Sequence, residues 1–548
     1  MGERRYNVGI PVRDGARLRA DIYFPAGEAP HPTVVGRTPY GKNNPGYARL
    51  VDAWNSRGYV LVLQDVRGRG DSDGEFTPYR NEGRDGYDTI EWVATQAWSN
   101  GDVVTHGGSY GARTAWLTAH EHPPHLKAMI VMVSPSDPFV ESPTSGESPM
   151  SICWHRIVDG RMVQNVEALD WMSIYEHLPL ITMDERAGFS SPHWREALSH
   201  TVRDDYWEPL RYQHRFGELD LPVLHVSGWY DDEQVGTPLN FAGMATGAKS
   251  DRARRSQGLL MGPWGHAPNA GRKLGEVDFG PTAVIEFERY LADWLDGVLG
   301  RTPPQPAASV RIFVMGVNEW RDEGEWPLAR TRYTDYHLHG GGNANSRFGD
   351  GTLSREPPTD EVPDRFTYDP ARPVPFITDA LSNQIGGPDD YSAIEQRGDV
   401  LCYTTDVLTE ELEVTGPVKL VLHASSSAVD TDFTAKLVDV HPSGFCQRLC
   451  DGVVRARYRD GVDHAVLMEP GTVYEMVVDM WNTCQVFKAG HRVRLEVSSS
   501  AFPKYDRNLN TGDDIGLGTR MNVAENRVWH DAAHPSRLVL PVIPPAGG

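Results

Sequence analysis

The sequence predicts an α/β domain that contains an inserted helical segment and is followed by an all-β domain. Residues 1–301 alternate short apolar runs with segments of helical spacing, except in 138–219, where the strand pattern is missing. Residues 302–548 hold alternating, β-branched runs separated by turns. The 548 residues also exceed what a single hydrophobic core usually serves, so more than one domain is expected.

The first part begins with a predicted hairpin. Apolar and polar residues alternate on both sides of Asp14-Gly15, a dipeptide that favours a tight turn between two strands. Strands and helices then alternate, which indicates a parallel sheet with helices on both faces. The predicted strands lie at 31–40, 59–68, 102–108 and 125–134, and the predicted helices at 47–58, 83–98 and 110–122.

Residues 138–219 are rich in aromatic residues and methionine with helical spacing, and we expect them to form a cap. The α/β pattern resumes over 220–301. The predicted linker, GRTPPQPAAS at 300–309, is rich in proline and small residues. Beyond it, 302–548 is predicted to form a jelly roll, on the evidence of the runs 417–426, 432–441, 472–481 and 491–500. The α/β domain therefore comprises 1–137 and 220–301.

The chain is acidic, which limits its partners. Its formal net charge is −22 and its pI is near 5.3, so its surface repels nucleic-acid phosphates and anionic lipid. The densest basic run, residues 251–258, is short. No apolar run reaches membrane-spanning length, and the first residues lack the apolar core of a signal peptide. We predict no nucleic-acid partner, no membrane contact and a cytoplasmic location; a homo-oligomer stays open.

The five cysteines form no recognisable framework. An odd number in a long chain does not suggest disulfides, and a reduced protein is expected. Cys446 and Cys450 are spaced C-x3-C without a second pair or a histidine cluster nearby, unlike a zinc site. No other pattern marks a metal site, and we expect neither a metal nor a cofactor.

One glycine-rich turn indicates a nucleophile. Gly107-Gly108-Ser109-Tyr110-Gly111 fits G-x-S-x-G, with an apolar strand before it and a helical segment after it. The flanking glycines permit the tight backbone that exposes the serine hydroxyl. The alternative is a polar serine in a flexible loop, but the strand-turn-helix context favours a nucleophile.

A serine hydroxyl needs a base to take its proton, and that base needs an orienting carboxylate. In α/β hydrolases these follow the serine in the order acid, then histidine, each after a later strand. Asp231 ends the strand in PVLHVSGWYD, and His266 follows the strand in GLLMGPWGH. We predict that they complete a catalytic triad with Ser109. His106 is closer in sequence, but we interpret it as structural.

Seven stretches together resemble one superfamily of serine hydrolases. In chain order, from about residue 8 to about residue 510, they are DGARLRADIYFP, RTPYGK, QDVRGRGDSDGEF, GGSYGA, GWYDD, GPWGH and FKAGHRVRLEVSSSAFP. The chain is similar in them to the superfamily of cocaine esterase, α-amino-acid ester hydrolase, glutaryl acylase and X-prolyl dipeptidyl-peptidase. The resemblance implies an α/β-hydrolase domain, a helical cap and a C-terminal jelly roll.

The resemblance also implies an oxyanion hole. These enzymes use a tyrosine hydroxyl from the TPY turn, here Tyr40, together with the backbone N–H after the nucleophile, here that of Tyr110. A phenol stays protonated at neutral pH and can donate to a developing oxyanion. The alternative is an ordinary turn tyrosine. In the neighbouring DVRGRGDSDG stretch, we expect Asp65 and Arg67 to pair beneath the site.

The substrate-binding residues are less well defined. Trp154, Trp171 and Trp229 are candidates for an aromatic acyl pocket, or else for packing in the cap.

In the resembling α-amino-acid ester hydrolases, a carboxylate cluster holds the substrate ammonium, with Glu and Asp two and three positions after the catalytic acid. Here Glu233 fits the first of these positions, and Gln234 departs from the second. Glu233 is thus a candidate ligand, with a plain loop carboxylate as the alternative, and Asp137 is a candidate third carboxylate.

The sequence therefore predicts a serine hydrolase that cleaves an ester or amide of a small acyl compound through an acyl-enzyme. Its rate should fall on the acid side as His266 is protonated, with an apparent pKa near ~6 to 7. One alternative is an acyltransferase or aminopeptidase-type biosynthetic enzyme with the same triad. Another is a non-catalytic carbohydrate-binding protein, because jelly rolls also occur in lectins.

Overall fold

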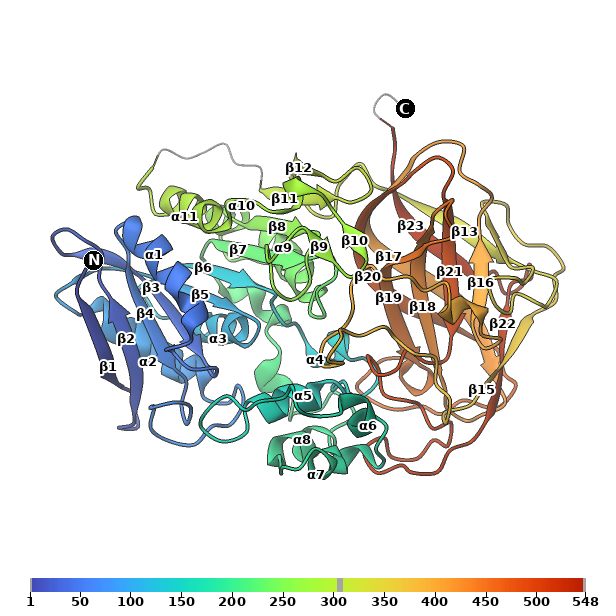
Figure 1. Cartoon of the computed structure of the whole chain (residues 1–548), viewed down its shortest axis with the longest axis horizontal. Helices are drawn as coiled ribbons and strands as arrows, with labels where there is room; N and C mark the ends of the chain where they lie inside the picture. Colours follow the sequence, from blue (N-terminus) through green and yellow to red (C-terminus); the bar gives the residue numbers. More distant parts are fainter. Residues whose placement is uncertain (1, 303–308, 546–548) are drawn as a thin grey trace.

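The computed structural model describes residues 2–302 and 309–545; residues 303–308 of the predicted linker lie outside the described residues. The described chain contains a ten-stranded sheet, an eleven-stranded sheet and a two-stranded ribbon. In Figure 1 the first sheet lies at the left, in blue to green, and the second lies at the right, in orange and red.

The first sheet is mainly parallel, in the order β1-β2-β4-β3-β5-β6-β7-β8-β11-β12. Its first two strands form the hairpin predicted at Asp14-Gly15. The central strands β4, β3, β5, β6, β7 and β8 pair in parallel. The strands are β1 (Arg4–Pro11), β2 (Arg17–Tyr23), β3 (His31–Thr38), β4 (Val60–Asp65), β5 (Ser99–Gly108), β6 (Leu126–Met132), β7 (Val223–Gly228), β8 (Gly258–Gly262), β11 (Val310–Val314) and β12 (Glu319–Glu323).

Helices cover both faces of this sheet because its strands are apolar on both sides. In β4, Leu61 and Leu63 join the cluster under α1 and α11, whereas Val60 and Val62 join the cluster under α2. The helices of this part are α1 (Ala48–Ser56), α2 (Glu82–Ala94), α3 (Tyr110–Ala119), α9 (Gly236–Gly247), α10 (Asp251–Arg255) and α11 (Phe287–Val298). The predicted α/β architecture is confirmed.

The chain between β6 and β7 forms the predicted helical cap. Its short helices gather below and between the two sheets in Figure 1. They are α4 (Pro138–Glu141), α5 (Ser151–Ile157), α6 (Trp171–Tyr175), α7 (Met183–Arg186) and α8 (Pro192–Ala197). Trp171, Met183 and Trp194 are buried in a core of the cap, which Phe502 of the C-terminal part joins. Helices this short are marginal alone, so this core stabilises them.

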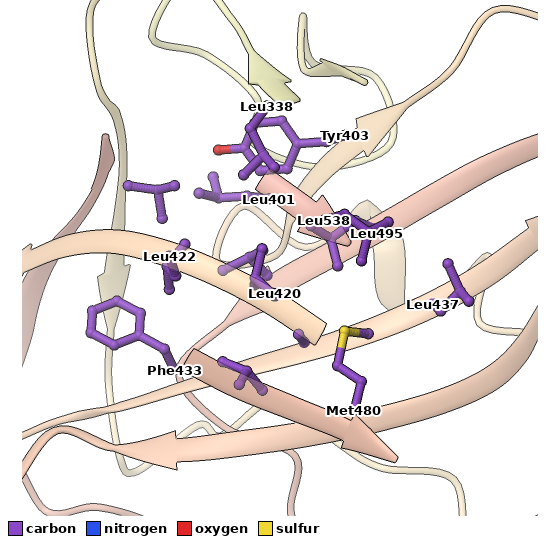
Figure 2. Packing of buried hydrophobic residues seen from close by; sticks show 14 of the residues in the cluster. Leu338, Leu401, Tyr403, Leu420, Leu422, Phe433, Leu437, Met480, Leu495 and Leu538 are labelled. Atoms are coloured by element: carbon purple, nitrogen blue, oxygen red, sulfur yellow. The ribbon is translucent and has the colours of Figure 1, made fainter. Parts of the chain in front are cut away.

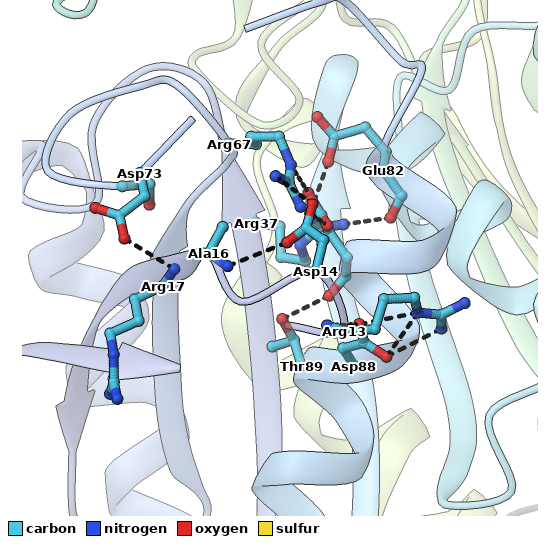
Figure 3. A network of polar contacts seen from close by, with 12 residues as sticks. Arg13, Asp14, Ala16, Arg17, Arg37, Arg67, Asp73, Glu82, Asp88 and Thr89 are labelled. Carbon is cyan, nitrogen blue, oxygen red and sulfur yellow. Dashed lines mark hydrogen bonds and ion pairs between the residues drawn. The ribbon is translucent and has the colours of Figure 1, made fainter. Parts of the chain in front are cut away.

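A polar network fixes the loops beside β3 and corrects one expectation (Figure 3). Arg67 does not pair with Asp65; its guanidinium binds both oxygens of Asp85 at 2.9 and 2.7 Å and reaches Asp14 at 2.9 Å. The two Asp85 oxygens match the planar fork of arginine, whereas the Asp65 oxygens are taken by backbone N–H groups of Lys42 and Asp71. The Asp65 carboxylate instead accepts the backbone N–H of Lys42 at 2.6 Å. The Lys42 contact holds the turn that follows β3, and the Arg67 contacts tie the loop after β4 to α2 and to the first hairpin.

The second sheet is largely antiparallel, as the jelly-roll prediction required, with the order β15-β22-β17-β23-β13-β14-β16-β21-β18-β19 and β20 paired to β17. Leu420, Leu437 and Leu495 project from three of its strands into one core (Figure 2). The strands are β13 (Arg332–His339), β14 (Thr352–Ser354), β15 (Asp364–Tyr368), β16 (Leu401–Thr404), β17 (Leu412–Ser426), β18 (Asp432–Val440), β19 (Cys446–Arg455), β20 (Tyr474–Phe487), β21 (Arg492–Ser498), β22 (Ala524–Trp529) and β23 (Arg537–Ile543).

The two sheets do not divide at residue 302, where the sequence placed the jelly roll. β11 adds to β8 in parallel and β12 adds to β11, so both continue the first sheet. The boundary between the sheets therefore falls between Glu323 and Arg332. Alternating β-branched residues alone do not say which sheet a strand joins, so the sequence pattern could not separate residues 310–323 from the strands that follow them.

The seam between the two parts has an apolar core and backbone hydrogen bonds. The Met315 N–H donates to the Cys484 carbonyl at 3.0 Å, and the Val486 N–H donates to the Met315 carbonyl at 2.9 Å. Trp229 and Phe313 from the first part pack in one cluster with Cys484 of the second. A seam with an apolar core indicates that the two parts fold against each other.

The five cysteines are all buried and unpaired. None of the helices in the described residues is long and apolar enough to cross a bilayer.

Candidate active site

Ser109 stands on a sharp turn between β5 and α3. Its φ of 55° and ψ of −123° are strained for a residue with a side chain. The backbone N–H of Ser109 bonds the carbonyls of Met132 and Val133 at 3.0 and 3.2 Å, which holds the turn. A Cβ on Gly107 would meet the Gly111 carbonyl oxygen at 2.4 Å, so only glycine fits there. This is the geometry of a nucleophile elbow.

Asp231 and His266 follow β7 and β8 and lie together. His266 Nδ1 is 2.8 Å from Asp231 Oδ1, and the Ser227 hydroxyl donates to Asp231 Oδ2 at 2.6 Å. A Cβ on Gly228 would lie 2.0 Å from the Trp264 carbonyl oxygen, so glycine lets the two loops approach. The Asp231 carboxylate is thereby fixed on both oxygens and can orient the imidazole.

A second carboxylate, which the sequence did not single out, reaches the same nitrogen. Asp232 Oδ1 lies 2.9 Å from His266 Nδ1. Burial opposes the charged imidazolium, but the negative charges of Asp232 and Asp231 raise the pKa of His266 well above its ordinary value. His266 is therefore protonated at higher pH than a free histidine.

His106, by contrast, is a packing residue. Its ring lies 5.8 Å from that of Trp54, and burial lowers the pKa of His106 to about 4. A neutral, buried histidine on β5 agrees with the structural interpretation.

Tyr40 follows β3 and faces Ser109 in one cavity of about 720 Å³. Its hydroxyl accepts a hydrogen bond from Trp154 Nε1 at 3.0 Å. Burial raises the pKa of Tyr40 to about 12, which keeps the phenol protonated. With Trp154 occupying a lone pair, the hydroxyl proton can point to an oxygen bound at Ser109.

Tyr110 contributes to the site through its backbone N–H and through its stacked aromatic ring. As the first residue of α3, it presents a backbone N–H that has no acceptor within the helix. Its ring stacks on Tyr79 at 4.5 Å, and both stack on Trp154. Its hydroxyl donates to Glu82, which pairs with Arg37 at the end of β3. The stack therefore ties the wall of the cavity to the polar network of Figure 3.

Several carboxylates line the same cavity as His266. Glu141, Glu147 and Glu233 are lining residues, and burial raises the pKa of Glu141 and of Glu147 to about 7. Burial and the neighbouring carboxylates raise the pKa of Glu233 well above its usual range. One oxygen of Glu233 is buried without a hydrogen-bond partner. Arg113 is a buried cation that lines the same cavity and lies 3.9 Å from Glu141.

Three expectations for the substrate site are corrected. Trp171 donates to the Val166 carbonyl in the core of the cap, and Trp229 donates to the Phe313 carbonyl in the seam. Neither lines the cavity, whereas Trp154 does. Asp137 is the N-cap of α4 and pairs with Arg211 at 2.8 Å, so it is not the third carboxylate.

Gln234 also lies outside the cavity, buried with its side chain donating to the Asn482 carbonyl at 2.5 Å. The carboxylates that line the cavity beside the predicted Glu233 include Asp232, which precedes it, and Glu141, one helical turn after Asp137. A periodic reading of α4 could have suggested Glu141, but its helix is too short for such a signal.

The C-terminal part closes one side of the cavity with residues that no local motif marks. Trp481, Lys504 and Tyr505 are lining residues. Trp481 has a φ of 64° beside a bulge in β20, and Lys504 Nζ lies 4.3 Å from its ring centroid. The Lys504 ammonium is held by Asp451 at 2.7 Å.

The elbow, the acid–histidine pair after later strands and the donor-lined cavity define a serine hydrolase with the α/β-hydrolase fold. Two family models match the chain: the X-Pro dipeptidyl-peptidase (S15 family) over residues 14–268, and the X-Pro dipeptidyl-peptidase C-terminal non-catalytic domain over residues 305–539. The chain belongs to this S15 family, and the family resemblance seen in the sequence is confirmed.

Relatives that match over nearly the full length of the chain support the same family. The chain is 36% identical to the cocaine esterase of Rhodococcus sp. (strain MB1 Bresler), over 98% of each chain. A solved aminopeptidase from a marine sediment Thaumarchaeota archaeon is 26% identical with a TM-score of 0.88, covering 99% of this chain and 97% of that one.

A solved α-amino acid ester hydrolase shares the fold, with a TM-score of 0.87 at 24% identity, over 98% of this chain and 96% of that one. The chain is a serine hydrolase that acts on esters or amides, which removes the non-catalytic alternative.

Proposed function

We propose that Ser109, His266 and Asp231 form the catalytic triad and that the enzyme cleaves an ester or amide of a small acyl compound through an acyl-enzyme. The observation that carries this proposal is that the strained Ser109 turn shares one cavity with His266, whose Nδ1 bonds Asp231. A volume of about 720 Å³ suits a small molecule rather than a folded protein.

The proposed steps follow from the positions of the atoms. The Ser109 hydroxyl attacks the carbonyl carbon while His266 takes its proton, and Asp231 stabilises the imidazolium that forms. The Tyr40 hydroxyl and the Tyr110 N–H donate to the oxygen that becomes negative. His266 then returns the proton to the leaving alcohol or amine. Water, deprotonated by His266, releases the acid from Ser109.

An active-site label tests the nucleophile. A fluorophosphonate should add one adduct to the wild type, and Ser109→Ala should abolish both the adduct and the turnover of nitrophenyl esters. Ser227→Ala is a matched control, because Ser227 holds Asp231 but lies outside the cavity. It should keep the adduct, with reduced activity. An adduct that persists in a folded Ser109→Ala protein would contradict the proposal.

The carboxylates favour an acyl group that carries an amine. Asp232, Glu233 and Glu141 face the cavity, and the unpartnered Glu233 oxygen is ready to accept a hydrogen bond from an ammonium. The similarity to a solved aminopeptidase also supports an acyl group that carries an amine. The raised pKa of Glu233 means that a bound cation is needed to keep it charged.

Paired substrates test the amine. Alanyl and propionyl nitrophenyl esters differ only in the amino group. Glu233→Gln should raise KM for the alanyl ester by roughly tenfold or more and leave the propionyl ester nearly unchanged, since only the ammonium loses its partner. Equal effects on both esters would show that Glu233 does not recognise the amine.

Acyl transfer is the remaining alternative, because the same acyl-enzyme can react with an amine or alcohol instead of water. Adding amines during turnover separates the two. Release of mainly free acid at millimolar amine supports a hydrolase, and predominant transfer product would assign the chain to the acyltransferases.

A further inference from the structure

Three side chains of types that can bind metal ions lie close together at the seam between the two parts, away from the active-site cavity. They are Asp439 near the end of β18, His441 just after that strand, and His491 just before β21. One ligand atom from each lies within 4.8 Å of the others. A second cavity, of about 260 Å³, opens over them.

The register of the sheet brings them together. β18 and β21 pair antiparallel, with Val440 opposite Arg492, so the same register places His441 opposite His491. Asp439 and His441 are two residues apart on an extended chain and project to the same side. The imidazole rings of His441 and His491 indeed lie 4.4 Å apart.

The ligand atoms are spaced for a small divalent ion. His491 Nδ1 lies 2.8 Å from Asp439 Oδ1, and His441 Nε2 lies 3.9 Å from Asp439 Oδ2. Two ligands of a tetrahedral Zn²⁺, at about 2.1 Å from the ion, stand roughly 3.4 Å apart. The two measured distances reach the two different oxygens of the Asp439 carboxylate, and each differs from this spacing by roughly half an ångström.

A buried polar atom independently points to a ligand. Gln485 is 2% exposed and lines the second cavity, and its Nε2 donates to Asp439 Oδ2 at 2.9 Å. Its Oε1 has no hydrogen-bond partner. A buried amide oxygen without a hydrogen-bond partner destabilises the fold, and a metal ion or a metal-bound water would satisfy it.

We propose that Asp439, His441 and His491 bind a divalent transition-metal ion such as Zn²⁺, with the Gln485 amide oxygen facing the ion or its water. Two imidazoles and one carboxylate are a ligand set that Zn²⁺ and its neighbours in the first transition row prefer over Mg²⁺ or Ca²⁺.

The role of this site is structural. Phe279, Gly316 and Asn318 of the first part line the same cavity, so a bound ion would hold the turns of the second sheet together at the seam. Gln447 contacts His441 at 3.2 Å and donates to the Tyr230 hydroxyl at 3.2 Å, beside Asp231. The ion would therefore also steady the loop that carries Asp231.

Metal titration of the full-length enzyme tests the proposal. After treatment with a chelator, Zn²⁺ is added in a calorimeter, and the metal retained after gel filtration is counted. One tightly bound Zn²⁺ per chain is expected. His441→Asn and His491→Asn should each weaken binding by more than the ~10- to 100-fold typical of losing a mere supporting contact, while circular dichroism stays unchanged.

Two controls make the result decisive. His464→Asn, on an exposed loop, removes a histidine outside the cluster and should bind Zn²⁺ like the wild type. Asp232→Asn alters the other close group, Asp231, Asp232 and His266. The proposal is overturned if no stoichiometric Zn²⁺ binds to the wild type, or if binding survives in folded His441→Asn and His491→Asn. Loss of binding in Asp232→Asn alone would also overturn it, because the ion would then sit in the catalytic cavity.

Discussion

The two sheets of this chain place their polar residues in different ways. In the first, the proposed catalytic groups follow the carboxyl ends of parallel strands: Tyr40 after β3, Ser109 after β5 and His266 after β8. The second contributes none of the proposed catalytic groups, and its buried charges pair with one another, as Arg455 does with both oxygens of Asp432 at 2.8 Å. The first sheet thus positions the proposed catalytic groups, and the second part forms one wall of their cavity.

This difference explains why both parts are needed. Strand ends point their loops to one edge of a parallel sheet, so separate segments converge there. That edge is open until Trp481 and Lys504 of the second part cover it. The C-terminal part therefore completes a cavity whose chemistry comes from the first part.

The largest expected effect comes from removing the second sheet. A fragment ending at Glu323 keeps β11 and β12 but exposes the apolar seam around Trp229 and Phe313. We expect it to aggregate, because an exposed apolar face of this kind is normally covered. Soluble yield and circular dichroism measure this. A soluble fragment with full esterase activity would show that the second part is dispensable.

A smaller effect is expected inside the first part. Tyr40→Phe removes one proposed oxyanion donor, and kcat should fall by roughly 10²- to 10³-fold with little change in KM. Tyr47→Phe is the matched control, since its hydroxyl bonds Thr38 at 3.1 Å outside the cavity. A Tyr40→Phe enzyme as fast as the control would remove Tyr40 from the oxyanion hole.

Asp232 should set the pH at which the rate falls on the acid side of the profile. His266 must be neutral to take the proton, and the carboxylates of Asp231 and Asp232 raise its pKa. The acid limb of the kcat/KM profile should therefore lie above the ~6.5 of a free histidine, higher than the sequence suggested. Asp232→Asn should move that limb to lower pH, with the plateau rate changed only a few-fold. An unmoved limb would show that Asp232 does not act on His266.

The smallest effect is expected in the cavity wall that the second part forms. Trp481→Ala should lower kcat/KM by roughly tenfold, about 1.4 kcal/mol, through KM, because the ring bounds the cavity without touching the reacting atoms. Trp481→Phe should fall in between. A large drop in kcat at constant KM would contradict this passive role.

The residues that the sequence identified are those that follow their own strands. Ser109, Asp231 and His266 each have a local signal, an apolar run followed by a turn, and the structure places all three at one edge of the first sheet. The sheet-forming runs of the C-terminal part were also predicted, because alternation is local.

What the sequence missed depends on tertiary contact. Trp171 and Trp229 look like pocket residues by composition, yet only the three-dimensional packing puts them in the cap and the seam. Trp481 lies 372 positions after Ser109 in the numbering, and no local pattern joins them. His441 and His491 meet through sheet register, so spacing rules for metal sites gave no sign of them.

The most direct test of the central claim is to trap the acyl-enzyme itself. A nitrophenyl ester with a slowly hydrolysed acyl group, quenched in acid within the burst, should add one acyl mass to the chain. Peptide mapping should place that mass on Ser109, and it should be missing from Ser109→Ala. A burst whose acyl group maps to another residue, or turnover without any covalent acyl species under slow deacylation, would contradict the proposed mechanism.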